Sequence, residues 1–299
     1  MNFVALRRKA LGWFHQHREA KAWGLLGPGF VWLLLFFVAP ILIMFAYSFM
    51  PRGEYGGVDS GFTFENYARF ADPLYIGIVW RTLLDSVACT VICVLLGYPV
   101  AYVVARATKW RNVLMFLVVL PFWTSFLVRT FAMIFLLRDT GLINTLLADI
   151  GLESLDDPII MLYTPFAVML GLVYGFLPFM ILPIYSSLEK LDLSLLEAAE
   201  VLGARPTARF LRITLPLSMP GVVAGSMLVF IPALGSFLTS DLLGGAKNVL
   251  IGNVVQAQFS TARNWPFGSA LSFIVMALVL VAVMGYLRAR DRGAELGAK

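Results

Sequence analysis

Residues 186–221 read SSLEKLDLSLLEAAEVLGARPTARFLRITLPLSMPG, a charged stretch that stands between long apolar runs. Many of its residues favour a helix by intrinsic propensity. Ser194 and Glu197 have the S-x-x-E spacing of a capping box, which predicts that a helix begins at Ser194. Gly203 is suited to end this helix, because glycine readily adopts the left-handed conformation found just beyond many helix ends.

A second short helix is expected between Pro206 and Pro216. Proline fits the first turn of a helix, and a later proline is expected to stop it. The two helices would form a compact knuckle at about residues 188–217. A short Ala-rich helix with a tight glycine turn is suited to insert into a groove on another protein and to transmit a rigid-body movement.

The composition of the chain is that of a membrane protein. Of its 299 residues, 60% are hydrophobic and 14% are charged, and the mean hydropathy is +0.82. This excess of apolar residues excludes a water-soluble fold, because such a fold needs more polar surface. Six apolar runs are each long enough for a membrane-spanning helix of about 20 residues. They lie at about 29–49, 78–104, 113–137, 159–185, 220–242 and 269–287.

We therefore expect an all-α membrane protein with six transmembrane helices, in which the knuckle lies between the fourth and fifth spans. The third and fourth spans contain prolines, which mark kinks or interruptions whose freed carbonyl groups must be satisfied inside the bundle. Helices of this kind commonly line a pathway. The prolines are Pro121, Pro165, Pro178 and Pro183.

The distribution of Lys and Arg predicts the orientation in the membrane. With both termini in the cytoplasm, most of the 23 basic residues lie on the cytoplasmic side, as the positive-inside rule requires. The knuckle is then cytoplasmic as well. Because the net charge of +5 is concentrated next to the membrane, it does not indicate a nucleic-acid partner. The cytoplasmic basic residues are Arg7, Arg8, Lys9, Arg18, Lys21, Arg106, Lys109, Arg111, Lys190, Arg205, Arg209, Arg212, Arg288, Arg290, Arg292 and Lys299.

The predicted organisation is a single transmembrane domain with two short flanks. Residues 1–23 have the basic and apolar spacing of an amphipathic surface helix. Residues 24–288 form the six-span domain, and residues 289–299 form a cytoplasmic tail. The outer loops are comparatively acidic, which suits a cationic solute, although translocated loops also tolerate acidic residues without any such role.

Metal, thiol and nucleotide chemistry have little support in the sequence. Cys89 and Cys93 stand four residues apart on one predicted helix, a poor geometry for a disulfide. The two histidines, His15 and His17, lie on the distant basic arm. No GxxxxGK[ST] motif is present, so we expect no ATP site, and we expect no cofactor or metal.

The knuckle carries a specific resemblance. Glu197-Ala198-Ala199, Gly203 and Ile213-x-Leu215-Pro216 resemble the EAA loop of bacterial binding-protein-dependent ABC importer permeases, with matching spacing. In that family the loop holds the coupling helix, which docks on the ATP-hydrolysing subunit. The resemblance therefore implies that Glu197, Ala198, Ala199 and Gly203 contact the ATPase, and that this chain is a permease subunit rather than an enzyme.

Within that family, four stretches look most like the spermidine/putrescine permeases of the bacterial inner membrane: residues 120–130, 171–192, 240–259 and 263–270. The resemblance implies half of an alternating-access path for a polyamine. It also implies two ATPase subunits, a second similar permease and a solute-binding protein. Permeases for other organic cations, iron or thiamine share parts of the pattern and remain alternatives.

A multivalent ammonium ion crossing the membrane needs carboxylates, carbonyl groups or aromatic faces. Trp123, Tyr174, Phe237 and Asp241 are therefore the candidate path residues, with packing, interfacial or helix-capping roles as the alternatives. Asp85 and Arg129 also lie at membrane depth and could pair with each other, or with a partner subunit, instead of contacting the solute. The Gly244-Gly245 pair, with Asn248 and Asn253, suggests an outer loop that folds back toward the bilayer.

Two other classes of function remain to be weighed. An ion-coupled secondary carrier would be expected to show internal inverted repeats, which are not evident here. A membrane-embedded enzyme would need a convergent catalytic set, but the predicted spans contain no histidine and no paired acid and base.

Overall fold

The computed structural model describes residues 18–151 and 158–297. These residues are almost all helical, with no β-strand among them beyond one isolated bridge between Arg52 and Val58. The predicted arm at 1–23 lies mostly outside the described residues. The predicted tail continues the last helix as far as Gly297. The helices are α2 Arg18–Leu33, η1 Leu34–Val38, α3 Ala39–Ser48, α4 Glu65–Phe70, α5 Pro73–Arg106, α6 Arg111–Val119, η2 Leu120–Trp123, α7 Phe126–Leu137, α8 Leu142–Asp149, α9 Pro165–Glu189, α10 Ser194–Val201, α11 Pro206–Arg209, η3 Phe210–Thr214, α12 Leu215–Gly235, η4 Ser240–Gly244, η5 Gly245–Lys247, α13 Ile251–Phe259 and α14 Trp265–Gly297.

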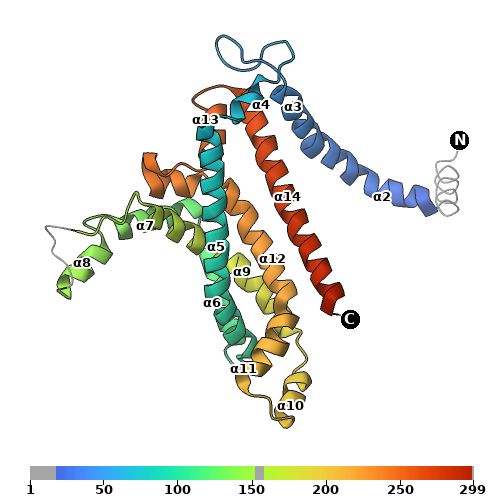
Figure 1. Ribbon diagram of the computed structural model, residues 1–299, viewed down its shortest axis with the longest axis vertical. Helices are drawn as coiled ribbons and strands as arrows, with labels where there is room; N and C mark the ends of the chain where they lie inside the picture. The colour runs from blue at the N-terminus through green and yellow to red at the C-terminus, as the bar shows by residue number, and fades with distance from the viewer. Residues whose placement is uncertain (1–17, 152–157, 298–299) are drawn as a thin grey trace, which may run out of the picture.

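The core of the molecule lies where α5, α9 and α12 pack together (Figure 1). Cys89 and Cys93 of α5, Met180 and Ile184 of α9 and Val229 of α12 are fully buried there. Both cysteines are free thiols, in agreement with their unsuitable spacing. Helix α14 lies beside this core, and α7 and α8 project from one side of it (Figure 1).

Among the described residues, five helices are long and apolar enough to cross a membrane, and a bent helix pair makes a sixth when its two halves are taken as one span. The first span, Leu26–Ser48, has none of its apolar window buried within the chain. It points away from the bundle on the side opposite α7 and α8 (Figure 1). A span this exposed requires lipid or another subunit as its neighbour.

The third span is not the single helix that we expected over 113–137. It is broken between Trp123 and Phe126, where the two halves meet at 92°. Pro121 lies just before the break, and Thr124 and Ser125 have extended backbones. Because proline lacks an N–H and clashes with the preceding turn, this is where a helix is most easily interrupted. In α9, by contrast, Pro178 and Pro183 lie inside an unbroken helix.

Two details of the knuckle also differ from expectation. Ser194 does not cap α10; the Asp192 carboxylate accepts the Ser194 N–H at 2.9 Å instead. This bond stabilises the charged carboxylate and holds the pKa of Asp192 below its usual value. Pro216 does not stop the second helix, because it occupies the first turn of α12, where proline is tolerated. The predicted fifth span at 220–242 is accordingly shifted, with α12 ending at Gly235.

Candidate functional site

The knuckle forms one extreme end of the molecule, opposite the end that carries α4 and α13 (Figure 1). Gly203 has a φ of +78°, so it occupies the left-handed turn that the sequence predicts. The turn is closed by the Ala204 N–H, which donates to the carbonyl of Ala199 at 2.9 Å. Helix α10 thus ends in a tight turn whose shape depends on glycine.

The outer face of the knuckle is unusually exposed. Glu197 and Ala198 are exposed and Ala199 is half-buried, while Val201 and Leu202 keep 88% and 85% of their surface accessible. Small side chains beside two uncovered aliphatic ones form an exposed apolar patch, a kind of surface that protein partners commonly cover. The predicted contact residues and Gly203 therefore lie together on one accessible helix and turn.

The candidate path residues are distributed over three elements. Trp123 lies at the break in the third span, 74% exposed, with its ring edge-on to Phe116. Tyr174 is on α9. Phe237 and Asp241 are neighbours, because the Asp241 N–H donates to the Phe237 carbonyl at 2.8 Å. The Asp241 side chain is exposed.

Gly171 brings the segment that carries Asp241 onto α9. A β-carbon at Gly171 would lie 2.5 Å from Leu243 Cδ1 and 2.6 Å from Thr239 Cγ2, distances at which atoms overlap. Any larger residue would require the side chains of Leu243 and Thr239 to shift. Tyr174 is one helical turn further along α9, so three of the four candidate path residues belong to elements that pack together.

Asp85 and Arg129 do not pair with each other, contrary to one of the possibilities that we considered. Asp85 Oδ2 lies 3.9 Å from Arg81 Nε, one helical turn away. Arg129 has its guanidinium 5.7 Å from the centre of the Phe126 ring and 6.0 Å from that of Tyr174. Its Nε and Nη1 are buried without a hydrogen-bond partner among the described residues. Within the described residues, the faces of these two aromatic rings therefore provide the contacts to the positive charge of Arg129.

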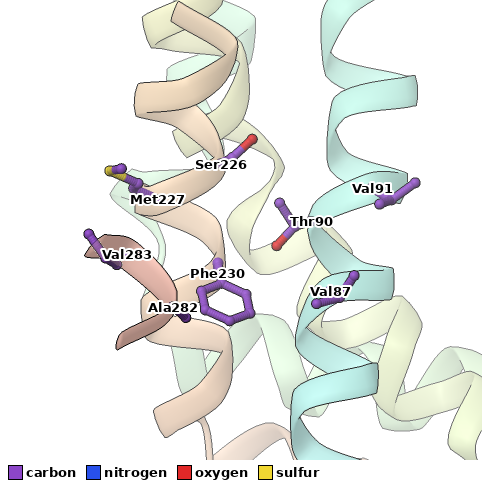
Figure 2. Close-up of a pocket in the computed structure, with 8 residues that line it drawn as sticks. All are labelled: Val87, Thr90, Val91, Ser226, Met227, Phe230, Ala282 and Val283. Carbon is purple, nitrogen blue, oxygen red and sulfur yellow. The ribbon is translucent and has the colours of Figure 1, made fainter. Parts of the chain in front are cut away.

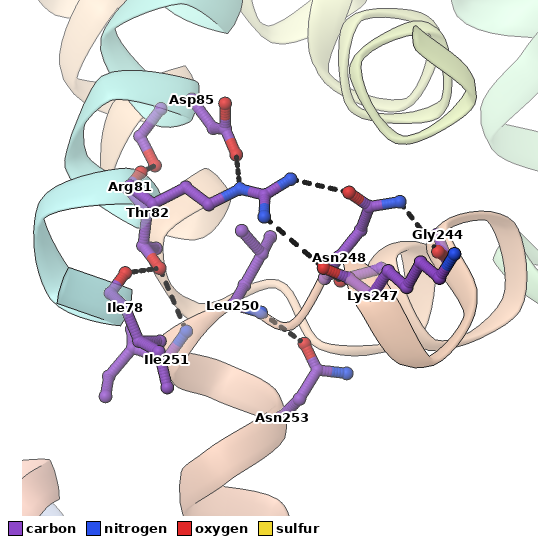
Figure 3. A network of polar contacts seen from close by, with 12 residues as sticks. Ile78, Arg81, Thr82, Asp85, Gly244, Lys247, Asn248, Leu250, Ile251 and Asn253 are labelled. Atoms are coloured by element: carbon purple, nitrogen blue, oxygen red, sulfur yellow. Dashed lines mark hydrogen bonds and ion pairs between the residues drawn. The ribbon is translucent and has the colours of Figure 1, made fainter. Parts of the chain in front are cut away.

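Residues 240–250, the predicted outer loop, pack against α5 and the start of α9, and a polar network centred on the buried Asn248 fixes them there (Figure 3). Asn248 is the centre of this network: its side-chain NH₂ donates to the carbonyls of Gly244, at 2.8 Å, and Tyr163, at 3.1 Å. Arg81 of α5 donates to Asn248 Oδ1 at 2.5 Å. Residues 240–250 are therefore tied to α5 and to the start of α9.

A second bond fastens the loop to α5 at the entry to α13. The Ile251 N–H donates to Thr82 Oγ1 at 2.9 Å, and both residues are buried. The roles of Arg81 and Thr82 were not predicted from the sequence. The sequence indicates these roles only through position, because a basic and a polar residue near the end of a long apolar helix need hydrogen-bond partners.

An apolar cavity of about 310 Å³ lies between α5, α12 and α14. Figure 2 shows its lining, which is aliphatic and aromatic apart from the hydroxyl groups of Thr90 and Ser226. None of the lining residues carries a charge. A multivalent ammonium ion placed here would lack a counter-charge, so this cavity is unsuited to a cationic solute.

A comparison with models of known protein families identifies the family of this chain. Residues 93–290 match the model of the binding-protein-dependent transport system inner membrane component family. The chain belongs to this family, and it is a multi-pass subunit of the inner membrane.

Particular relatives are similar over almost the whole chain. The spermidine/putrescine transport system permease protein PotB of Haemophilus influenzae is 48% identical, over 87% of this chain and 91% of that protein. Its namesake from Escherichia coli K12 is 45% identical, over 89% of this chain and 97% of that protein. Among solved structures, a bacterial ABC transporter that imports the acidic polysaccharide alginate matches with a TM-score of 0.71 at 18% identity, over 94% of this chain and 98% of that one. The structural match shows the fold alone.

Proposed function

We propose that this chain is a permease subunit of an ATP-driven importer and forms half of the path that carries a polyamine, such as spermidine or putrescine, across the inner membrane. The observation that carries the proposal is the 48% identity to a spermidine/putrescine permease over 87% of the chain. The aligned stretch covers 87% of the chain, so it includes both the knuckle and the candidate path. A second, similar permease completes the path.

The proposed mechanism is alternating access. Two ATPase subunits bind and hydrolyse ATP, and their closure moves the knuckles of both permeases. The spans then switch between inward-open and outward-open arrangements, and a solute-binding protein delivers the polyamine to the outer face. A solved alginate transporter of the same fold in complex with its periplasmic protein supports the binding-protein partner.

Glu197, Ala198, Ala199 and Gly203 are proposed to form the ATPase contact. Their exposure beside Val201 and Leu202 supports this role, because a docking helix must be uncovered in the free subunit. Trp123, Tyr174, Phe237 and Asp241 are proposed to line the polyamine path. The aromatic residues would offer cation-π contacts and Asp241 a charge-assisted hydrogen bond to the ammonium groups.

The substrate and the energy source are tested together by uptake of radiolabelled spermidine into cells that lack their own polyamine importers. Expression of this chain with its partner subunits is expected to restore uptake that vanadate inhibits, and excess putrescine but neither thiamine nor iron should compete. Competition by thiamine or iron alone would transfer the assignment to those solutes. Vanadate-resistant uptake that a proton uncoupler abolishes would support a secondary carrier.

We expect Asp241→Asn to raise the KM for spermidine by about tenfold, because loss of a charge-assisted contact of about 1.4 kcal/mol weakens binding by that factor. Asp139→Asn is the matched control, since Asp139 is another exposed acid on the same predicted side of the membrane. Uptake kinetics at saturating binding protein measure both variants. An unchanged KM in Asp241→Asn would remove this residue from the path.

Cysteine labelling tests the proposed orientation, in which the knuckle and both termini are cytoplasmic. The natural Cys89 and Cys93 are fully buried and give little background. Tyr55→Cys, at a position 95% exposed on the other end of the molecule, is expected to react with a membrane-impermeant maleimide in intact spheroplasts. Leu202→Cys should react only after permeabilisation, and the reverse pattern would invert the topology.

A further inference from the structure

Phe210 occupies the junction between the knuckle and the membrane helices. It is the first residue of η3, the π-helical turn between α11 and α12. Its ring stands edge-on to two tyrosines of α5, with centroids 5.7 Å from Tyr98 and 5.8 Å from Tyr102 and planes at 90° and 83°. Edge-to-face geometry is the favourable arrangement for aromatic pairs. Because Tyr98 and Tyr102 are one helical turn apart, the phenylalanine is seated between them.

The two tyrosines are themselves held in place. The Tyr98 hydroxyl shares a buried hydrogen bond of 2.7 Å with the hydroxyl of Ser218 on α12. The guanidinium of Arg106 lies 4.5 Å from the centre of the Tyr102 ring. Phe210 therefore contacts a fixed ridge of α5, so that a displacement of its ring acts on the helix itself.

On its other side, Phe210 is coupled to α10 through the preceding residue. Arg209 Nη1 lies 2.5 Å from a carboxylate oxygen of Glu200, near the end of α10. This ion pair ties α10 to α11 across the Gly203 turn. A rigid-body shift of α10 thus acts on the Arg209 side chain and, through residue 209, on the adjoining Phe210.

A cavity of about 440 Å³ occupies much of the remaining space between the knuckle and α5. Glu197 and Glu200 line it from α10, Tyr102 and Arg106 from α5, and Phe210 from η3. An open cavity transmits no displacement, because force between packed elements passes through contacting atoms. The linker from α9 gives α10 a covalent connection to α9, and one connection from α10 to α5 runs through Arg209 and Phe210.

We propose that Phe210 is a positioning residue that transmits the movement of the coupling helix α10 to α5 through its contacts with Tyr98 and Tyr102. The π-helical turn supports this role. The Leu215 N–H bonds to the carbonyl of Phe210, five residues back, and such local expansions of a helix are frequent at functional sites. The inference rests on the proposed function, in which an ATPase drives α10.

The first test compares ATP hydrolysis and spermidine uptake in the complete reconstituted complex. Phe210→Ala is expected to keep ATP hydrolysis within about twofold of the wild type, while uptake per ATP falls by about tenfold, a change equivalent to about 1.4 kcal/mol. Phe210→Tyr retains the ring and is expected to retain the ratio. Phe45→Ala is the matched control, because Phe45 forms a similar edge-on pair with Phe273, 5.2 Å away, between α3 and α14.

A proportional loss of hydrolysis and uptake in Phe210→Ala would overturn the proposal, since a residue that only supports folding affects both. An unchanged ratio of spermidine uptake to ATP hydrolysis in Phe210→Ala would also overturn it. Thermal unfolding and the yield of assembled complex accompany each variant, so that loss of protein is separated from loss of coupling.

A second measurement does not depend on the cargo. Spin labels at Val103→Cys on α5 and Val281→Cys on α14, positions 59% and 64% exposed, report the movement of α5 in the full complex. Adding ATP with vanadate is expected to change their separation in the wild type and to leave it nearly constant in Phe210→Ala. An equal change in both proteins, or no change in either, would overturn the role of Phe210. If the wild-type complex shows the change yet carries no polyamine, the polyamine assignment fails while the role of Phe210 stands.

Discussion

Complexes that carry Gly203→Asp are expected to lose at least about 90% of ATP-driven uptake, because the change places a charged side chain in the turn of the docking helix. A loss of about 1.4 kcal/mol in the permease–ATPase contact weakens it about tenfold. The subunit itself should still fold. No atom lies within 4 Å of a β-carbon built at Gly203, and aspartate is among the non-glycine residues that tolerate the left-handed region best.

Two further substitutions at this position separate the causes of that loss. Gly203→Asn has nearly the same shape as the aspartate but no charge, so it should retain more uptake if the added charge is the main cause. Gly203→Ala adds backbone strain of about 1–2 kcal/mol with little bulk. Co-purification of the ATPase measures the contact directly. Full ATPase association in Gly203→Asp would contradict the docking role of this turn.

Asn248→Leu is expected to have the second large effect, because it removes the centre of the outer-loop network. The substitution removes one of the acceptors of Arg81, the one bonded to Nη2, and deprives the carbonyls of Gly244 and Tyr163 of a donor. The Gly244 carbonyl lies in the buried part of the network, and a buried polar group left without a partner costs about 1–3 kcal/mol. Residues 240–250 should then detach from α5, displacing Asp241 and lowering uptake severely.

Limited proteolysis of the purified subunit and spermidine uptake measure this effect together. Asn253→Leu is the comparison variant, since Asn253 bonds the Phe237 carbonyl at 2.9 Å from the other end of the loop but is not bonded to Arg81. It should loosen the loop less. Equal proteolytic sensitivity in the wild type and Asn248→Leu would show that the network is not what fixes the loop.

The parts of the fold that depend on local chemistry could be predicted from the sequence. The left-handed turn at Gly203 follows from glycine's freedom at positive φ, and the helix start at Pro206 follows from the fixed φ of proline. The membrane spans follow from the length of the apolar runs. The capping box failed for a local reason as well, because the carboxylate of Asp192, two residues earlier, accepts the Ser194 N–H that the Glu197 carboxylate would accept in a capping box.

Other features depend on contacts between distant residues and could not be predicted in this way. Pro121 indicated a weak point in the third span, but the 92° bend depends on what each half packs against. Arg81 and Asn248 are 167 residues apart in the chain, and no local pattern connects them. The packing of Phe210 between Tyr98 and Tyr102 likewise depends on the placement of η3 beside α5, which no local pattern predicts.

The central claim is tested most directly by ATP-driven polyamine uptake into proteoliposomes that contain this chain with its co-purifying permease, ATPase and binding-protein partners. Radiolabelled spermidine or putrescine is supplied with the binding protein on one side and ATP on the other. The account predicts accumulation that requires ATP and every subunit and that vanadate stops. ATP hydrolysis without transport of either amine would contradict the substrate assignment, and accumulation without any ATPase subunit would contradict the importer itself.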